Sequence, residues 1–157
     1  MVDPELFRRV LGAWPSGVTI VTSRAGERVQ GMTVSAFTSV SLEPPLVLVC
    51  ADKASITNSL IEASGVFAVS MLASDQQEIS NRFASKRDEH RRFEGLDCRD
   101  GETGCPRIPG AVGWLDCRVE MPVDAGDHFV YIARVEAAEF TDQDPLVYHR
   151  ARYAQLG

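Results

Sequence analysis

Small hydroxyl side chains gather in one stretch of the chain, residues 31–50. Those of its first half are Thr33, Ser35, Thr38, Ser39 and Ser41. Apolar residues lie between them, so that one face of the stretch can pack while the other offers short hydrogen-bond donors. Pro44-Pro45 then imposes an extended connection, and the unbroken apolar run at residues 46–50 predicts a strand buried on both faces. Such a surface of hydroxyls and backbone N–H groups suits a flat polar ligand with a phosphate tail.

A second polar group follows directly. Lys53 lies in a predicted loop, and Ser55 is placed to cap a helix that runs to about Ala63. The first amides of a helix are unpaired and carry partial positive charge, so beside a hydroxyl and an ammonium group they can hold a phosphate. A helix cap next to a solvated lysine explains the same spacing, and these residues alone leave the two interpretations even.

The histidines and cysteines show no metal-ligand spacing. His90, His128 and His149 form no His-x-His or His-x-x-x-His pair, and the four cysteines form no Cys-x-x-Cys pair. We therefore predict no metal site and interpret the cysteines as buried free thiols, with a pairing or a metal at Cys98 and Cys105 as the alternative. His128 begins a strand after a turn, where a side chain can reach over a neighbouring cleft.

The signatures of several common enzyme classes are absent. The chain has no G-x-G-x-x-G, no G-x-x-x-x-G-K-[ST] and no G-x-S-x-G, which counts against Rossmann, P-loop and α/β-hydrolase chemistry. No serine is singled out by its surroundings as the nucleophile of a Ser-His-Asp triad.

Short strands separated by turn signals dominate the rest of the chain. Asp3-Pro4 begins a short amphipathic helix that ends at Pro15, and Ser74-x-x-Gln77 has the form of a capping box for a helix that ends near Phe83. Strands are predicted at residues 18–23, 66–71, 113–121 and 128–136, with Phe140 and residues 146–149 closing the sheet. This pattern predicts a mainly β protein with short helices, built as an antiparallel barrel or sandwich.

Residues 84–113 lack a periodic pattern and predict a long irregular surface loop. Its bases are Lys86, Arg87, Arg91 and Arg92, and acidic residues are mixed with them. Loops of this length are usually functional or disordered. The bases can meet an anionic ligand, although a solvated face is the default interpretation.

Length and charge narrow the class of protein. At 157 residues we expect one domain, residues 1–157. The net charge of −6 argues against a nucleic-acid or membrane-surface binder. The first residues show no signal-peptide pattern, and no apolar run is long enough to span a bilayer, so we expect a cytoplasmic protein.

Four motifs in this order resemble the flavin reductase family. They are Ser16-Gly17-Val18-Thr19-Ile20-Val21-Thr22, the hydroxyl-rich stretch from Gly31 to Ser41 with Pro44-Pro45, Lys53-x-Ser55, and Gly126-Asp127-His128. The chain is similar in particular to short-chain NAD(P)H:flavin oxidoreductases that serve as the reductase component of two-component flavin-dependent monooxygenases. The resemblance implies an FMN-binding split β-barrel, a Greek-key antiparallel barrel, usually assembled as a homodimer with flavin sites near the subunit interface.

The resemblance also implies site residues. Those expected along the flavin ring and ribityl chain are Met32, Thr33, Val34, Ser35, Ala36, Ser39 and Val40. Those expected at the flavin phosphate are Ala51, Asp52, Lys53 and Ser55, with Asn58 assisting. Phe83 and Arg87 would reach the ribityl or adenylate end. The turn that contains His128 would face the nicotinamide cofactor, with Tyr148 as a neighbour.

The implied reaction passes a hydride from C4 of NADH or NADPH to N5 of FMN or FAD, and the reduced flavin then supplies a partner monooxygenase. Orientation and exclusion of water carry this chemistry, so no acid–base catalytic side chain is expected, with His128 as the one candidate. Two alternatives remain open: a flavoprotein that retains FMN as a prosthetic group to reduce another acceptor, and a non-catalytic flavin-binding module. The sequence chooses neither between the two flavins nor between the two nicotinamide cofactors.

Overall fold

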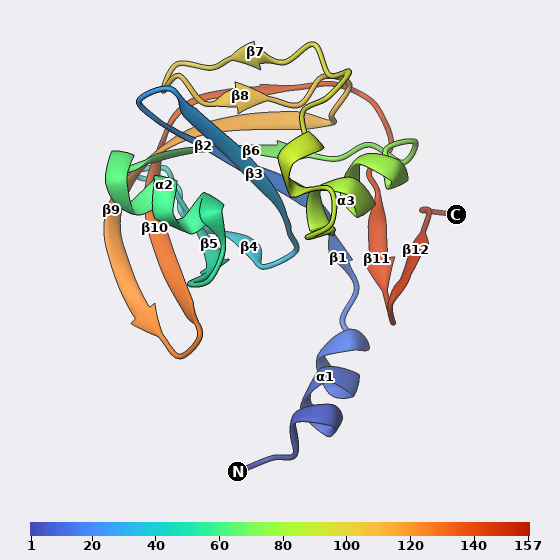
Figure 1. Cartoon of the computed structure of the whole chain (residues 1–157). Helices are drawn as coiled ribbons and strands as arrows, with labels where there is room; N and C mark the ends of the chain where they lie inside the picture. Colours follow the sequence, from blue (N-terminus) through green and yellow to red (C-terminus); the bar gives the residue numbers. More distant parts are fainter.

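The computed structural model describes residues 1–157, and its main element is a seven-stranded antiparallel sheet with the order β3-β2-β6-β9-β10-β5-β4. In chain order its strands are β2 (Thr19–Ala25), β3 (Arg28–Val34), β4 (Phe37–Ser41), β5 (Leu46–Asp52), β6 (Val66–Met71), β9 (Gly113–Ala125) and β10 (His128–Phe140). The two edge strands, β3 and β4, are joined only by Ser35 and Ala36, so the sheet must roll until its edges meet (Figure 1). The predicted mainly β class with short helices is confirmed.

Two small sheets and short helices surround the main sheet. One small sheet has the order β1-β11-β12, and the other pairs β7 with β8. Their bounds are β1 (Ser16–Gly17), β7 (Arg99–Asp100), β8 (Pro106–Arg107), β11 (Val147–His149) and β12 (Arg152–Ala154). The helices are α1 (Pro4–Gly12), α2 (Ile56–Ser64), α3 (Gln77–Ala84) and the single 3₁₀ turn η1 (Glu89–Arg91). No helix is long and apolar enough to cross a membrane.

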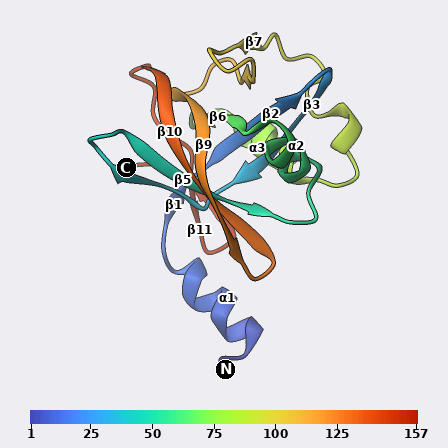
Figure 2. The same ribbon diagram turned by 90° about the vertical axis from the view of Figure 1, so that its left-hand side faces the viewer.

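Two of the three α-helices pack on the main sheet, and the third does not. α2 and α3 pack on β2 and β3, whereas α1 stands clear of the sheet in both views (Figures 1 and 2). The last strands also differ from the prediction, because β11 pairs with β1 rather than closing the main sheet.

Local side-chain bonds explain where the first two helices begin. The carboxylate of Asp3 accepts a hydrogen bond from the Leu6 amide over 3.1 Å, and Ser55 Oγ accepts one from the Asn58 amide over 3.1 Å. Both predicted helix starts are therefore confirmed. The predicted capping box at Ser74 is wrong: α3 begins after Gln76, whose side chain instead accepts a hydrogen bond from the Ala73 amide over 2.9 Å.

Strand β5 is buried on one face only, which corrects the prediction. Val47, Val49 and Ala51 point into the core, while Leu48 and Cys50 between them remain half-buried. The run misled because both faces of this strand are apolar. The second face lines a cavity instead of a second core layer.

Residues 84–113 are more ordered than the predicted irregular loop, since they contain η1 and the β7–β8 ladder. Arg92 is buried rather than solvated, and its guanidinium donates to the carbonyls of Gly31 (2.8 Å) and Ser85 (3.1 Å). Burial lowers the pKa of Arg92, and the nearby Glu89 carboxylate partly offsets this effect. The guanidinium thus ties the segment after α3 to β3.

A buried ion pair orders the turn between β7 and β8. Asp116 is fully buried on β9, and its carboxylate accepts hydrogen bonds from Arg107 (2.5 Å) and from the Glu102 amide (2.9 Å). The bond to Asp116 raises the pKa of Arg107. A Cβ at Gly101 would lie 2.1 Å from this carboxylate, so only glycine fits there.

A buried hydrogen bond connects β10 with α2. The Tyr131 hydroxyl on β10 donates to the side-chain oxygen of Asn58 on α2 over 2.6 Å, and both residues are buried. Burial raises the pKa of Tyr131 to about 12. The bond therefore ties α2 to β10.

We expect Tyr131→Phe to lower the free energy of unfolding by about 1–3 kcal/mol, because it leaves the buried Asn58 oxygen without a donor. Urea denaturation followed by far-UV circular dichroism measures the change. Tyr148→Phe is the matched control, since the Tyr148 side chain is partly exposed. Equal stabilities of the two variants would contradict the assigned bond.

All four cysteines are free thiols, and Cys117 is fully buried. Burial is the main reason why the pKa of Cys117 is raised to about 12, with the charge of Asp116 adding to it. The folded-state pKa exceeds the unfolded one, so this contribution to stability is complete below about pH 9 and is lost as the pH rises toward 12.

We therefore expect Cys117→Ala to lessen the fall in unfolding free energy between pH 7 and pH 10 by about 1 kcal/mol. Urea titrations of both proteins at the two pH values test this. Between pH 6 and pH 8 the two proteins must respond alike, because the thiol stays protonated in both the folded and the unfolded state.

Candidate functional site

A cavity of about 780 Å³ opens beside the connection from β3 to β4. Its walls are mostly apolar and include Leu48, Cys50, Met71, Leu72, Val112, Pro145, Leu146 and Trp14. The hydroxyl-bearing residues Ser16, Thr19, Ser35 and Thr38 also line it, although the Thr19 hydroxyl donates to the Val34 carbonyl over 2.6 Å. This size and composition are typical of a small-molecule site for an aromatic ring with polar edges.

The connection itself offers unpaired backbone donors. The carbonyl of Ala36 accepts a hydrogen bond from the Cys50 amide, and that of Ser35 accepts one from the Phe37 amide, each over 3.0 Å. The amides of Ser35 and Ala36 donate to no acceptor within the chain, and both residues are exposed. Two free N–H groups beside an apolar cavity form a suitable cradle for an aromatic ring that gains negative charge.

A second group of donors lies at the end of β5. Ser55 caps α2, and the first helical amides, those of Ile56 and Thr57, make no hydrogen bond inside the chain. The Lys53 ammonium lies 5.1 Å from the centre of the Phe129 ring. Free helical amides and an ammonium group fit a phosphate, whereas the Ser55 hydroxyl already donates to the Asp52 carbonyl over 2.8 Å.

Strand geometry places both groups on one face of the sheet. Leu48, Cys50 and Asp52 alternate with the core residues of β5, so they share the outer face. His128 on β10 pairs with Asp52, and paired residues of antiparallel strands share a face. The three residue steps from Cys50 to Lys53 span about 10 Å, so an elongated ligand can lie with its ring in the cavity and its anionic tail at the loop.

Several residues expected along the flavin ring, and Ala51 expected at the phosphate, can contribute only their backbone. Met32, Val34 and Ala51 have buried side chains in the core. The Thr33 hydroxyl donates to the Ser80 carbonyl on α3 over 2.6 Å, which turns this side chain toward the helix. Ser39 and Val40 are exposed on β4, outside the lining of the cavity.

The other expected residues lie farther from the cavity. Phe83 is fully buried, with its ring 5.2 Å from that of Phe93, and leaves no surface for a ligand. Arg87 is exposed in the segment after α3. The Asn58 side chain accepts a hydrogen bond from Tyr131 in the core, and the Asn58 backbone amide donates to Ser55, the cap of α2. Tyr148 pairs with Ser16 across β1 and β11, next to the cavity wall.

The turn that contains His128 lies next to the loop after β5. The Lys53 amide donates to the Asp127 carbonyl over 3.0 Å, and His128 Nδ1 lies 2.7 Å from the Asp127 carboxylate. The hydrogen bond with His128 lowers the pKa of Asp127. The structure thus brings together the loop at Lys53 and the turn at His128, which are far apart in the sequence.

Parts of the cavity wall were missed by sequence analysis. Trp14 follows the first helix, and Pro145 enters the site by a bridge to Ala73. Pro145 carries no local signal, since it becomes a wall only through this long-range pairing. Ser16-Gly17 had a signal, because it belongs to the first of the four motifs.

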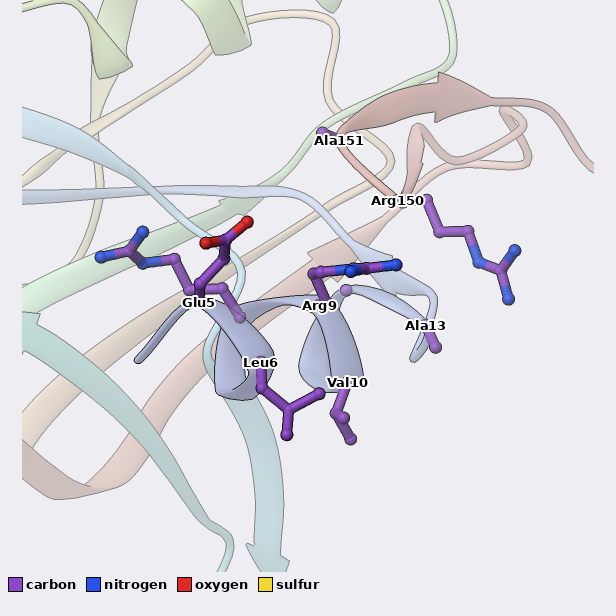
Figure 3. Close-up of a pocket in the computed structure, with 9 residues that line it drawn as sticks. Glu5, Leu6, Arg9, Val10, Ala13, Arg150 and Ala151 are labelled. Carbon is purple, nitrogen blue, oxygen red and sulfur yellow. The ribbon is translucent and has the colours of Figure 1, made fainter. Parts of the chain in front are cut away.

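A separate cavity of about 810 Å³ lies between α1 and the turn that joins β11 to β12 (Figure 3). Arg8, Arg9 and Arg150 line it together with Glu5. It contains none of the expected site residues and none of the free amides described above. The cavity beside Ser35 is therefore the candidate site.

A family model described as "Flavin reductase like domain" matches residues 11–157. The chain belongs to the flavin reductase family. The resemblance found in the sequence is thereby confirmed, together with the split-barrel fold and the class of enzyme, an NAD(P)H:flavin oxidoreductase.

Three named proteins illustrate the similarity of this flavin reductase to its relatives. HsaB, the reductase subunit of a flavin-dependent monooxygenase from Mycobacterium tuberculosis, is 39% identical over 99% of this chain and 83% of its own length. The FMN reductase (NADH) SmoA of Agrobacterium fabrum is 40% identical over 96% of this chain and 84% of its own. A solved structure of the NADH:FAD oxidoreductase SgcE6 of Streptomyces globisporus, in complex with NAD and FAD fragments, has a TM-score of 0.92 at 35% identity and covers 100% of this chain and 96% of that one.

We expect Lys53→Ala to weaken FMN binding about tenfold while leaving riboflavin, which lacks the phosphate, unchanged. Quenching of flavin fluorescence gives both dissociation constants. Lys86→Ala is the control, because Lys86 is an exposed lysine outside the loop. A parallel loss of riboflavin affinity would show that Lys53 does not act on the phosphate.

Proposed function

We propose that this flavin reductase uses NADH or NADPH to reduce FMN or FAD at the cavity beside Ser35, and that it releases the reduced flavin to a partner monooxygenase. The observation that carries this proposal is the pair of free amides at Ser35 and Ala36 above an apolar cavity. Ser35 and Ala36 line the same cavity as Leu48 and Cys50, and these two share the outer face of β5 with Asp52 at the start of the loop to Ser55. This arrangement supports a ring site and a phosphate site at the two ends of one surface.

The chain's own residues orient and shield the reactants. A bound flavin supplies the acceptor, N5, for the hydride of the nicotinamide. The free amides of Ser35 and Ala36 would hold the edge of the ring where negative charge gathers on reduction. The apolar wall around Leu48 and Leu72 would exclude water from the stacked rings. No proton-transferring side chain is required.

His128 is assigned to the nicotinamide cofactor through its place beside the loop. Asp127 holds His128 Nδ1, so Nε2 remains free to meet a ligand. Because His128 faces Asp52 rather than the cavity, we assign it to the ribose or phosphate groups of the dinucleotide. NADH and NADPH are intracellular, and we keep the cytoplasm as the proposed location.

The deciding experiment is anaerobic oxidation of NADH and of NADPH with and without added FMN, FAD or riboflavin, with reduced flavin followed by absorbance. We expect saturable turnover that depends on added flavin. Turnover independent of added flavin would instead favour a protein that retains FMN as a prosthetic group. Flavin binding without any oxidation of either nucleotide would contradict the proposed reaction.

We also propose that the protein is a homodimer whose interface includes α1. The apolar side of this helix is at least half exposed, at Leu6, Phe7, Val10 and Leu11, and Trp14 directly after it is exposed too. An apolar face on a helix that stands clear of its own sheet is typical of an association surface (Figure 2). Leu11 and Trp14 also line the cavity, so a second copy would cover the flavin site.

Light scattering after gel filtration tests the assembly. We expect a mass of twice 17.2 kDa for the unaltered protein and a shift toward the single-chain mass for Phe7→Asp. Arg8→Gln, on the polar side of α1, is the control. A single-chain mass for the unaltered protein at micromolar concentration would contradict the proposed dimer.

A further inference from the structure

The Lys53 ammonium is already occupied by another residue of the chain. Its Nζ lies 2.5 Å from the Asp124 carboxylate, which reaches it from β9, 71 residues farther along the chain. Asp124 lies outside the four motifs that resemble the flavin reductase family. The carboxylate therefore stands where the proposed phosphate site needs a free cation.

The charges around the ammonium are mostly negative. Asp52 belongs to the same loop and accepts a hydrogen bond from the Ala54 amide, which removes one more donor from the site. Asp127 lies in the adjoining turn, and the charge of Lys53 contributes to its lowered pKa. Lys53 and the adjoining His128 are the only basic side chains in these contacts. A phosphate monoester brings between one and two further negative charges.

We propose that Asp124 is a specificity-determining residue that competes with the flavin phosphate for Lys53. This inference rests on the proposed function, since it needs the phosphate at the loop from Asp52 to Ser55. A phosphorylated flavin has to displace the Asp124 carboxylate before it can pair with the ammonium. The exchange keeps the affinity for FMN and FAD moderate, which favours release of the product.

The geometry makes this exchange easy. The Asp124 side chain is 72% exposed, so the displaced carboxylate returns to water without a desolvation penalty. The Lys53 side chain is 35% exposed and rests against Phe129, which keeps the ammonium in place when its partner leaves. An exposed ion pair of this kind changes an equilibrium constant by about two- to fivefold.

The test compares Asp124→Asn with the unaltered protein in fluorescence titrations of FMN and riboflavin. We expect the dissociation constant of FMN to fall about two- to fivefold while that of riboflavin stays constant. Inorganic phosphate should compete with FMN more strongly in the variant. Asp124→Ser is a second variant, and circular dichroism confirms that each is folded.

Glu120→Gln is the matched control. Glu120 lies on the same strand and pairs with Arg134 over 2.5 Å, so its replacement removes the same charge away from the loop. We expect it to leave both dissociation constants unchanged. An equal gain in FMN affinity from Glu120→Gln would mean that net charge, rather than competition at Lys53, causes the effect, and would overturn the inference.

Two further results separate this inference from the proposed function. If the unaltered protein binds FMN more tightly than riboflavin but Asp124→Asn does not respond, the inference fails while the phosphate site stands. If the unaltered protein binds FMN and riboflavin equally and Lys53→Ala changes neither, the phosphate site is absent and both fail together.

Discussion

The hydrogen bond from the Cys50 amide to the Ala36 carbonyl marks the constraint on which the rest of the structure depends. β3 and β4 are the two edges of the main sheet, yet only two residues separate them in the chain. The sheet satisfies this connection by rolling, and the linking residues are held against β5 with their own amides unpaired. Closure of the barrel and creation of the ligand cradle are therefore one event, because the same short connection produces both.

The strand period then distributes tasks along β5. Val47, Val49 and Ala51 build the core, while the alternate residues Leu48, Cys50 and Asp52 lead from the cavity wall to the loop from Asp52 to Ser55. The pairing with β10 adds Tyr131 to the core and His128 to the outer face by the same rule. A shift of the register by one residue would exchange these two sets, so the site is as strongly specified as the core.

The sequence predicted what depends on neighbouring residues. Ser55 was identified as a helix cap because the cap, the helix and the amide it accepts from lie within four positions, and the order of motifs identified the family. Contacts between distant segments could not be predicted from the sequence. Arg92 was expected in solvent, but it is buried and donates to the Gly31 carbonyl of β3. The pairing of Arg107 with Asp116 has no local pattern either. Phe83, expected at a ligand, proved to be a core residue for the same reason.

The long β9–β10 hairpin has a thermodynamic consequence. Each of its strands has 13 residues (Figure 2). Tyr131, the fourth residue of β10, holds the hairpin to the core close to its tip, and the tip carries the groups around Lys53. Side chains mounted on such a ladder have already lost most of their backbone freedom on folding. A ligand that arrives there has little chain to order, so its affinity reflects contacts almost alone, and its exchange is not slowed by the refolding of a loop.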